Sequence, residues 1–468
     1  MAVPLRRVDR NDDGIATAVP VLKQRFGPHC HTGADMRRQH GHTTSWLANE
    51  APDAVVFVTT AQDVEDVLEI CRTHGVPVIA FGVGTSLEGH VNAPAGGVSV
   101  DFSQMNRIIE VQDEDLTCTV EPGVTRKQLN DFLRDRGLFF PIDPGADASL
   151  GGMCATRASG TNAVRYGTMR DNVIALEAVL ADGRALKTAS RAKKTSAGYD
   201  LTRLLIGSEG TLGLITKITL KLHGIPEAIS AAVCPFPSVE AACNATILTI
   251  QSGIPVARIE LLDALQIRAV NAYAKLGLPE QPTLFLEFHG SQSSVTDQSE
   301  AVAAIAEELG GGPFSFSTRA EERNKLWQAR HDSYWAALGL RPGAAGISTD
   351  VCVPISRLAE CVADTQADLE ELGLLAPIVG HVGDGNFHTL VLVDNDNADE
   401  RAKATLFLER LAERALTMDG TCTGEHGIGQ GKIKYLRREL GDTAVDVMAA
   451  IKSTLDPQNI LNPGKILS

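Results

Sequence analysis

Hydrophobic and polar residues alternate along the first part of the chain in a way that predicts helices and strands in turn. In residues 60–75 (TAQDVEDVLEICRTHG), apolar side chains recur at helical spacing, Thr60 can cap the start and Gly75 can end the helix. Residues 76–81 (VPVIAF) follow as a continuous apolar run, which is typical of a buried strand. Together they predict a unit in which a helix leads directly into a strand.

Similar patterns predict further strands and a second capped helix. Strands are expected at residues 98–102, 107–112, 116–122, 173–180 and 184–187. The dipeptide Asp182-Gly183 predicts a tight turn between the last two strands. Residues 125–137 predict a helix that opens with a capping box from Thr125 to Gln128 and closes on Gly137.

The pattern changes twice before the middle of the chain. Residues 141–168 are crowded with small residues and show almost no periodicity, which predicts a long functional loop. After residues 200–222 a domain boundary is expected near Gly224-Ile225-Pro226. Beyond it, a split β-α-β arrangement with an antiparallel sheet is predicted from strands 229–236, 256–262 and 283–290 and helices 238–252 and 295–309.

A long helix and a glycine-rich tail complete the second half. The helix is predicted over residues 319–339, and it places Leu326, Trp327, Arg330 and Tyr334 on adjoining turns of one face. The tail combines a polar, glycine-rich stretch at 421–432 with a helix from about 434 to 452.

Composition narrows the functional classes. A chain of 468 residues suggests two or three domains, and its net charge of -15 argues against a nucleic-acid footprint. The start, MAVPLRRVDRNDD, has neither a secretory nor a transit pattern, and no apolar run is long enough to span a membrane. Nine cysteines never fall as Cys-x-x-Cys, which fits a reducing compartment. We therefore expect a cytoplasmic protein, with at most peripheral association at the inner face of the membrane.

Three loops of small residues could bind an extended phosphorylated cofactor. Gly82 and Gly84 follow a strand, but Leu87 stands where a dinucleotide fingerprint needs a third glycine, and no Walker A sequence is present. Backbone N–H groups of such a loop can still close around a phosphate. Residues 145–160 and 207–213 are loops of the same kind, and their small side chains permit close backbone approach to a diphosphate and a ring system.

Residues 380–388 (GHVGDGNFH) carry two histidines around a turn. If Asp384-Gly385 form a two-residue hairpin loop, His381 and His388 become direct cross-strand neighbours, with Cβ atoms about 5 Å apart. The pair is then either half of a metal site or two packed or surface histidines. Residues 424–427 (GEHG) offer candidates for a further ligand, Glu425 and His426.

At this point the chain resembles a known family. Residues 78–90, 141–152, 160–167 and 207–213 look like the FAD-binding domain of the vanillyl-alcohol oxidase/p-cresol methylhydroxylase superfamily. The second half resembles the FAD-linked oxidase C-terminal domain, and the likeness covers residues 40 to 468. Residues 349–358, 380–388 and 421–429 are similar to the cytochrome-linked, FAD-dependent D-lactate dehydrogenases.

The resemblance implies an α+β fold. It consists of a two-subdomain FAD-binding domain of the PCMH type and a substrate (cap) domain with an antiparallel sheet flanked by helices. The expected boundaries are an N-terminal segment at 1–48 that packs on the FAD domain, the FAD domain at 49–225, the cap domain at 226–420 and a C-terminal segment at 421–468 that returns to the FAD domain.

The resemblance also implies the residues that contact FAD. They are Phe81, Gly82, Val83, Gly84, Thr85, Ser86, Pro144, Gly145, Ala146, Asp147, Ser149, Gly151, Gly152, Thr156, Ser159, Gly160, Asn162, Tyr166, Gly167, Glu209, Gly210, Gly213, Ile215 and Asn462. Thr85 stands where some relatives attach FAD covalently through a histidine, so non-covalent FAD is expected, while His90 a few residues on leaves a second candidate for attachment.

For the reaction, the resemblance implies a divalent metal, zinc or manganese, held by His381, His388 and Glu425. His426 is expected to be the catalytic base and to contact the substrate. Arg330 is expected to bind the substrate carboxylate on a face shared with Trp327 and Tyr334. The metal would lower the pKa of the substrate hydroxyl, His426 would take its proton, and a hydride would pass to flavin N5.

The predicted function is therefore oxidation of a D-2-hydroxy acid, D-lactate to pyruvate first of all, with a quinone, cytochrome or electron-transfer flavoprotein as external acceptor. Ser348 and Thr349, if they face the pocket, leave no second cation for a dicarboxylate. Three alternatives remain: the same chemistry on glycolate or D-2-hydroxyglutarate, a non-enzymatic flavin-binding subunit of an oxidase complex, and a metallohydrolase without flavin.

Overall fold

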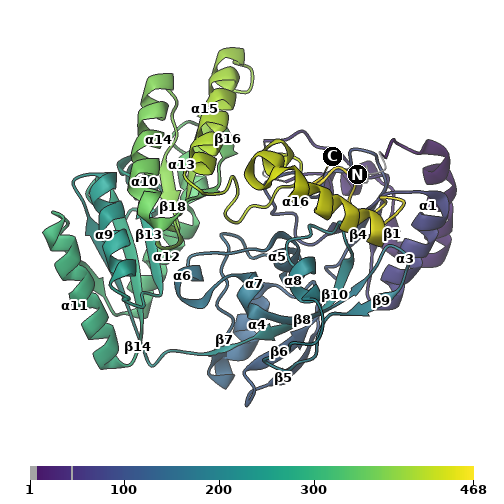
Figure 1. The fold of residues 1–468 in the computed structure, drawn as a ribbon, viewed down its shortest axis with the longest axis horizontal. Helices are drawn as coiled ribbons and strands as arrows, with labels where there is room; N and C mark the ends of the chain where they lie inside the picture. Colours follow the sequence, from purple (N-terminus) through teal and green to yellow (C-terminus); the bar gives the residue numbers. More distant parts are fainter. Residues whose placement is uncertain (1–7, 44–45, 468) are drawn as a thin grey trace. The chain divides into compact units, whose positions relative to one another are not determined.

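The computed structural model describes residues 8–43 and 46–467 and divides into two compact units (Figure 1). The first unit holds the described residues up to Ser159, Thr168–Gly224 and the chain from Glu425 onward. The second unit holds Gly160–Gly167 and Ile225–Gly424. Part of the N-terminal segment predicted at 1–48, and the first residues of the stretch searched for a targeting signal, lie outside the described residues.

The first unit begins with a small sheet whose strand order is β1-β2-β4-β3. Its strands are β1 (Cys30–His31), β2 (Ala54–Phe57), β3 (Val78–Phe81) and β4 (Val98–Asp101), and the last three are parallel. Helices α1 (Asp12–Phe26) and α3 (Ala61–His74) share a hydrophobic core with this sheet. As predicted, Thr60 caps α3 and Gly75 ends it in the left-handed conformation; the structure adds Asp63, whose side chain caps the backbone of Thr60 in return.

A second, antiparallel sheet in this unit has the order β5-β6-β10-β8-β9. Its strands are β5 (Ile108–Gln112), β6 (Thr117–Val120), β8 (Val173–Val179), β9 (Ala185–Lys187) and β10 (Leu214–Lys221), and a separate pair is formed by β7 (Leu138–Phe139) and β11 (His223–Gly224). The predicted turn at Asp182-Gly183 joins β8 to β9, which pair antiparallel, and the neighbouring strands β5 and β6 also pair antiparallel.

The first unit also contains several short helices and one long helix near the C-terminus. They are α2 (Ala34–Gln39), α4 (Arg126–Leu133), α5 (Leu150–Thr156), α7 (Met169–Asn172), α8 (Leu201–Leu205) and α16 (Ile433–Leu455), with 3-10 turns η1 (Gly27–His29) and η2 (Arg134–Arg136). Helix α16 is kinked at Gly441, whose φ of 78° interrupts the helical backbone.

The second unit is built on one large antiparallel sheet of order β15-β12-β14-β13-β18-β19-β16. The strands are β12 (Ala228–Pro235), β13 (Arg258–Leu262), β14 (Thr283–Gly290), β15 (Ser315–Ser317), β16 (Ala345–Ser348), β18 (Ile378–Gly380) and β19 (Asn386–Val393), with β17 (Val351–Cys352) also paired to β19. This is the antiparallel cap sheet that the sequence predicted.

Alternation along β13 separates the two faces of this sheet. Ile259 and Leu261 enter a large core with α9 (Val239–Gln251), α11 (Gln292–Glu308), α14 (Leu358–Leu372) and α15 (Ala398–Thr417). Figure 1 shows α9 beside α11 and α14 beside α15. Leu262 points to the opposite face, where it packs with α10 (Ala264–Ala274), α12 (Ala320–His331) and α13 (Ser333–Leu338). Glu260 shares that second face.

Several local predictions were wrong. The segment 141–168 is not a continuous loop, because it contains α5 and the short helix α6 (Ala163–Tyr166). Helix 319–339 is two helices, α12 and α13, which break at Asp332. The capping box of α4 is half formed: Thr125 accepts from the Gln128 N–H, but the Gln128 side chain donates to the carbonyl of Asn106. Helix α10 was not predicted.

The fold class is nevertheless the predicted one, a mixed helix-and-sheet architecture. Among the described helices, none combines the length and the apolar composition that a membrane span requires.

Candidate active site

The two histidines of residues 380–388 converge, but through a different turn from the one predicted. A 3-10 turn, η4 (Val382–Asp384), joins β18 to β19, and Val379 is the residue paired with His388. The predicted pairing of His381 with His388 is therefore wrong by two residues. Because side chains repeat every two residues along a strand, a slip of two keeps both histidines on the same face. Their ring centroids lie 5.4 Å apart with the rings nearly perpendicular.

Hydrogen bonds fix the orientation of both imidazoles. Nδ1 of His381 lies 2.8 Å from Oε1 of Glu260, and Nδ1 of His388 lies 3.0 Å from the carbonyl oxygen of Thr349. Both partners can only accept, so each Nδ1 carries the proton and donates it. Nε2 is then the nitrogen suited to ligate a cation, and an oxygen partner on the other ring nitrogen is the usual support of a metal-binding histidine. The donor set fits a divalent metal.

Glu260 is a buried carboxylate that also contacts the predicted substrate residue Arg330. Its Oε2 accepts from Nε of Arg330 at 2.8 Å, and Nη2 of Arg330 lies 2.6 Å away. Burial opposes ionisation of Glu260, but electrostatic attraction to His381 and Arg330 and the hydrogen bonds from both outweigh it, so the pKa of Glu260 lies below its usual value. Arg330 itself is buried on α12 and does not lie on a solvent-exposed helix surface.

The two predicted aromatic residues lie in different clusters of the second unit. Trp327 is buried edge-on against Phe285, with the guanidinium of Arg258 at 4.5 Å from its ring centroid. Tyr334 is half-buried in a separate cluster with Ala337 and Leu390, because the chain breaks between α12 and α13. The expectation of one continuous face is therefore wrong, while the substrate-binding roles stay predictions.

Asp350 and its partners hold the segment that leads to Glu425 and His426. Asp350 accepts from Nδ2 of Asn386 at 2.7 Å and from Oγ1 of Thr423 at 2.9 Å. A Cβ on Gly424 would lie 2.2 Å from that same amide nitrogen, so only glycine fits there. Gly424 is the last residue of the second unit, and consecutive Cα atoms are about 3.8 Å apart. Glu425 and His426 therefore follow directly on residues that Asp350 and Asn386 hold in place. Their roles as metal ligand and catalytic base stay predictions.

In the first unit, two of the predicted cofactor loops meet. A Cβ on Gly82 would lie 2.3 Å from Oγ of Ser149, so the backbone of the loop after β3 packs directly against a side chain of the loop before α5. Within the described residues, the buried hydroxyls of Ser86 and Ser149 have no hydrogen-bond partner. Buried polar groups are almost always paired, so these two fit a ligand that brings its own acceptors, as a diphosphate does.

The remaining predicted cofactor residues fall in a few places. Phe81 ends β3, and Val83, Gly84 and Thr85 follow it; Pro144, Gly145, Ala146 and Asp147 precede α5, which contains Gly151, Gly152 and Thr156; Ser159 lies beyond it; Gly210 and Gly213 lie between α8 and β10, and Ile215 lies in β10. Asn462 lies beside β3, where its N–H donates to the carbonyl of Val78.

Glu209 connects these loops to the C-terminal segment. Its carboxylate accepts from the backbone N–H groups of Ile428 at 2.7 Å and Gly429 at 2.8 Å, and its carbonyl accepts from Nδ2 of Asn462 at 2.7 Å. Glu209 and Asn462 have φ angles of 53° and 41°, which non-glycine residues rarely adopt. Strain of this kind gathers at functional sites.

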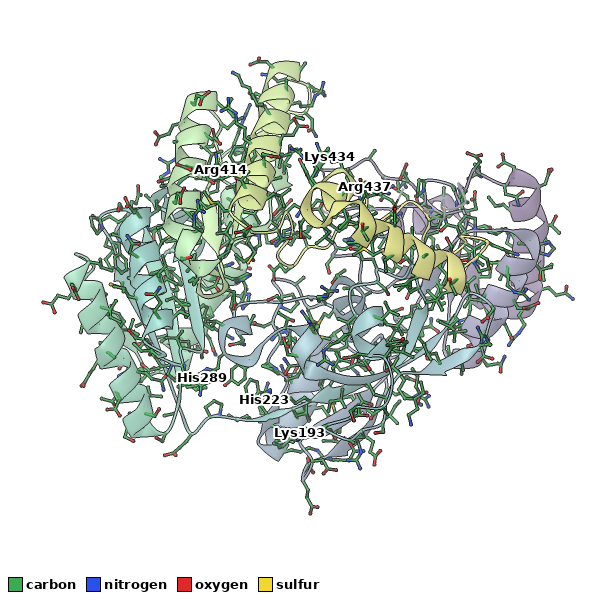
Figure 2. The ribbon with its side chains drawn as sticks, in the orientation of Figure 1. Lys193, His223, His289, Arg414, Lys434 and Arg437 are labelled. Carbon is green, nitrogen blue, oxygen red and sulfur yellow. The ribbon has the colours of Figure 1, made fainter. Side chains whose placement is uncertain are left out.

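Four predicted cofactor residues belong to the second unit. Gly160, Asn162, Tyr166 and Gly167 lie in the segment 160–167, which is grouped with the cap sheet and not with the loops of the first unit. Oδ1 of Asn162 accepts from Nε of Arg258 at 2.8 Å, and the Tyr166 hydroxyl lies 2.8 Å from Nδ1 of His289, which is labelled in Figure 2.

The sequence did not point to Glu260, Asp350 or Thr349 as supports of the two histidines. Glu260 offered one signal, a lone carboxylate in the otherwise apolar end of strand 256–262. A charge in such a strand is costly unless a cation pairs with it.

Comparison with known proteins agrees with this architecture. Residues 225–466 match the family model of FAD linked oxidases, C-terminal domain, and residues 52–189 match that of the FAD binding domain. A Danio rerio protein named "Probable D-lactate dehydrogenase, mitochondrial" is 53% identical over 93% of this chain and 88% of its own length. The Arabidopsis thaliana "D-lactate dehydrogenase [cytochrome], mitochondrial" is 48% identical over 95% of this chain and 79% of its own.

Other relatives are more distant. The Bacillus subtilis "Glycolate oxidase subunit GlcD" is 35% identical over 89% of each chain. Among solved structures, p-cresol methylhydroxylase with substrate bound aligns with a TM-score of 0.80 at 19% identity, over 98% of this chain and 97% of that one, which shows the fold. The names of the first two relatives place them in mitochondria, so the comparisons do not support the cytoplasmic prediction. The chain belongs to the family of FAD-linked oxidases, and it combines their C-terminal domain with an FAD-binding domain.

Proposed function

We propose that this protein is an FAD-dependent dehydrogenase that oxidises D-lactate to pyruvate and requires a divalent metal. The observation that carries the proposal is its identity of 53% and 48%, over more than nine-tenths of the chain, to relatives named D-lactate dehydrogenase. The convergent, oriented imidazoles of His381 and His388 support the metal part of the proposal.

Oxidation of a 2-hydroxy acid removes a proton from the hydroxyl and a hydride from Cα. When bound, FAD supplies the hydride acceptor, and a divalent cation supplies positive charge that lowers the pKa of the hydroxyl. In the proposal, His426 takes the hydroxyl proton on an imidazole nitrogen. His381, His388 and Glu425 would hold the metal, and Arg330 would bind the substrate carboxylate.

The loops of the first unit would hold FAD without a covalent bond. The unpaired hydroxyls of Ser86 and Ser149 and the close approach of Gly82 support FAD binding by these loops, and Thr85 in place of a histidine is the reason to expect no covalent bond. The electrons must then leave through a separate acceptor, and the cytochrome-linked relatives favour a cytochrome over a quinone or an electron-transfer flavoprotein.

The second candidate is the same chemistry on glycolate, which the Bacillus subtilis relative named as a glycolate oxidase subunit supports at 35% identity. That Ser348 and Thr349 offer no second cation to a dicarboxylate stays a prediction. The Thr349 hydroxyl shares a hydrogen bond with the Thr389 hydroxyl and accepts from the Thr389 N–H at 2.8 Å.

Anaerobic reduction of the flavin with a panel of D- and L-lactate, glycolate and D-2-hydroxyglutarate tests the proposal. D-lactate should bleach the flavin band fastest. A protein that binds flavin but is bleached by none of the acids would be a non-catalytic subunit, and a colourless protein with hydrolytic activity would be the metallohydrolase considered above. The variant His426→Ala should keep its flavin and lose reduction, and unchanged reduction would remove His426 as the base.

A further inference from the structure

One carboxylate joins the two halves of the proposed substrate site. Glu260 lies on β13, where the next residue, Leu261, pairs with Gly380 of β18. Continuing this antiparallel pairing by one residue places Glu260 directly opposite His381. Its two oxygens face different partners, His381 at 2.8 Å and Arg330 at 2.8 Å. We propose that Glu260 is a positioning residue that sets both the metal-ligating nitrogen of His381 and the substrate-binding edge of Arg330. This inference rests on the proposed function.

The contact with His381 selects one tautomer. A carboxylate can only accept, so it holds the proton on Nδ1 and leaves Nε2 with the lone pair that a cation needs. The charge of the carboxylate also makes the imidazole a stronger electron donor. Loss of that charge should therefore weaken metal binding even if His381 stays in place.

The contact with Arg330 selects one edge of the guanidinium. Nε and Nη2 are both engaged by Glu260, whereas Nη1 makes no hydrogen bond to any residue that the structure describes. The edge that carries Nη1 is therefore the one offered to a substrate carboxylate, and the planar guanidinium transmits the orientation set by Glu260. Because Arg330 is buried, its positive charge would be strongly destabilising without the paired carboxylate of Glu260.

A matched control lies on the neighbouring strand. Glu287 on β14 is likewise buried between a histidine and an arginine: Oε1 lies 2.8 Å from Nε2 of His289 and 3.5 Å from Nε of Arg258. The pairing of Arg258 with Glu287 puts this trio on the same face of the sheet as Glu260. His289 is not one of the proposed metal ligands, so Glu287→Gln removes an equivalent buried charge without touching the metal site.

The experiment compares the parent, Glu260→Gln and Glu287→Gln as FAD-loaded proteins. Each is stripped of metal with a chelator and titrated with Zn²⁺ alone against a chromophoric competitor, and thermal unfolding and FAD content are recorded alongside. We expect Glu260→Gln to bind Zn²⁺ about 10- to 100-fold more weakly than the parent, and Glu287→Gln to stay within about 3-fold of it. In Glu260→Gln, KM for D-lactate should also rise, since Arg330 loses its support.

Equal Zn²⁺ affinity in Glu260→Gln and the parent would overturn the inference, as would equal weakening in both variants or a parent that binds no Zn²⁺. If Glu260→Gln does not fold, Glu260→Asp replaces it; the shorter side chain keeps the charge but cannot reach both partners, and Zn²⁺ affinity should again fall by at least about 10-fold. Bleaching of the parent flavin by D-lactate reports the proposed function separately: bleaching combined with unchanged Zn²⁺ affinity in the variant refutes this inference alone.

Discussion

Removal of the Glu209 carboxylate should loosen the C-terminal segment just after residues 425 and 426. The side chain is buried and accepts two backbone N–H groups, from Ile428 at 2.7 Å and Gly429 at 2.8 Å. In Glu209→Ala both donors lose their partner inside the first unit. Hydrogen bonds to charged groups contribute about 1.5–3 kcal/mol each, so the pair predicts a loss of about 3–6 kcal/mol.

Glu209→Gln should lose less. Its amide oxygen can still accept one of the two N–H groups, without the charge, so we expect a loss of about 1.5–3 kcal/mol. Such losses are a large part of the 5–15 kcal/mol, roughly, by which a folded domain is stable. The hydrogen bond from Asn462 is accepted by the backbone carbonyl of Glu209, so both variants keep it. Glu209 is itself a predicted cofactor residue, and loss of its two side-chain contacts to Ile428 and Gly429 should make both variants retain FAD less well than the parent.

The assay is equilibrium unfolding in urea, followed by far-ultraviolet circular dichroism, together with flavin content after gel filtration. Glu177→Gln is the matched control, because Glu177 is a half-exposed residue of the same unit that pairs with Lys217 at 2.8 Å. Pairs of that kind contribute at most about 1 kcal/mol. If Glu209→Ala unfolds at the same urea concentration as the parent, or no earlier than Glu177→Gln, the reasoning about the anchor is refuted.

Three further predictions concern the second unit. Burial raises the pKa of Asp263 to about 7, although the hydrogen bond from the Gln266 N–H favours the ionised carboxylate. The pKa in the folded protein therefore lies above that of the unfolded chain, and the stability that protonated Asp263 contributes is complete below about pH 4 and is lost as the pH rises through 7. Asp263→Asn keeps the cap on α10 and should gain up to about 4 kcal/mol over the parent at pH 8 and almost nothing at pH 4, and equal gains at both pH values in urea titrations would contradict this. His388→Ala should contain little metal by elemental analysis and lose flavin reduction while keeping FAD; full metal content would exclude His388 as a ligand. Arg330→Lys should raise KM for D-lactate by about 10- to 100-fold, since a charge-assisted hydrogen bond contributes about 1.5–3 kcal/mol, and an unchanged KM would remove Arg330 from the substrate site.

Local pattern was sufficient for much of the fold. Helix α3, with its cap at Thr60 and its end at Gly75, and the hairpin of β8 and β9 follow from short-range chemistry that is fully visible in the sequence. The failures occurred where tertiary contacts override that chemistry. Asp384-Gly385 suggested a two-residue turn, but the chain forms a 3-10 turn and seats Gly385 against the carbonyl of Val353, where a Cβ would lie 2.0 Å away.

The candidate site shows the same division. His381 and His388 could be placed on one face from their spacing, and the slip of two residues in register left that conclusion intact. Glu260 could not be found, because its role depends on a strand more than a hundred residues earlier than His381 and on a helix that brings Arg330 beside it. Long-range pairing of this kind leaves no periodic signal in a single sequence.

The most direct test of the account is a pair of anaerobic titrations of the purified, FAD-loaded protein, one with D-lactate and one with L-lactate, followed at the flavin absorption band. The account predicts that D-lactate bleaches the band completely, that L-lactate leaves it unchanged, and that pyruvate appears in amounts equal to the flavin reduced. A flavin that stays oxidised with D-lactate, or that responds equally to both enantiomers, would contradict it.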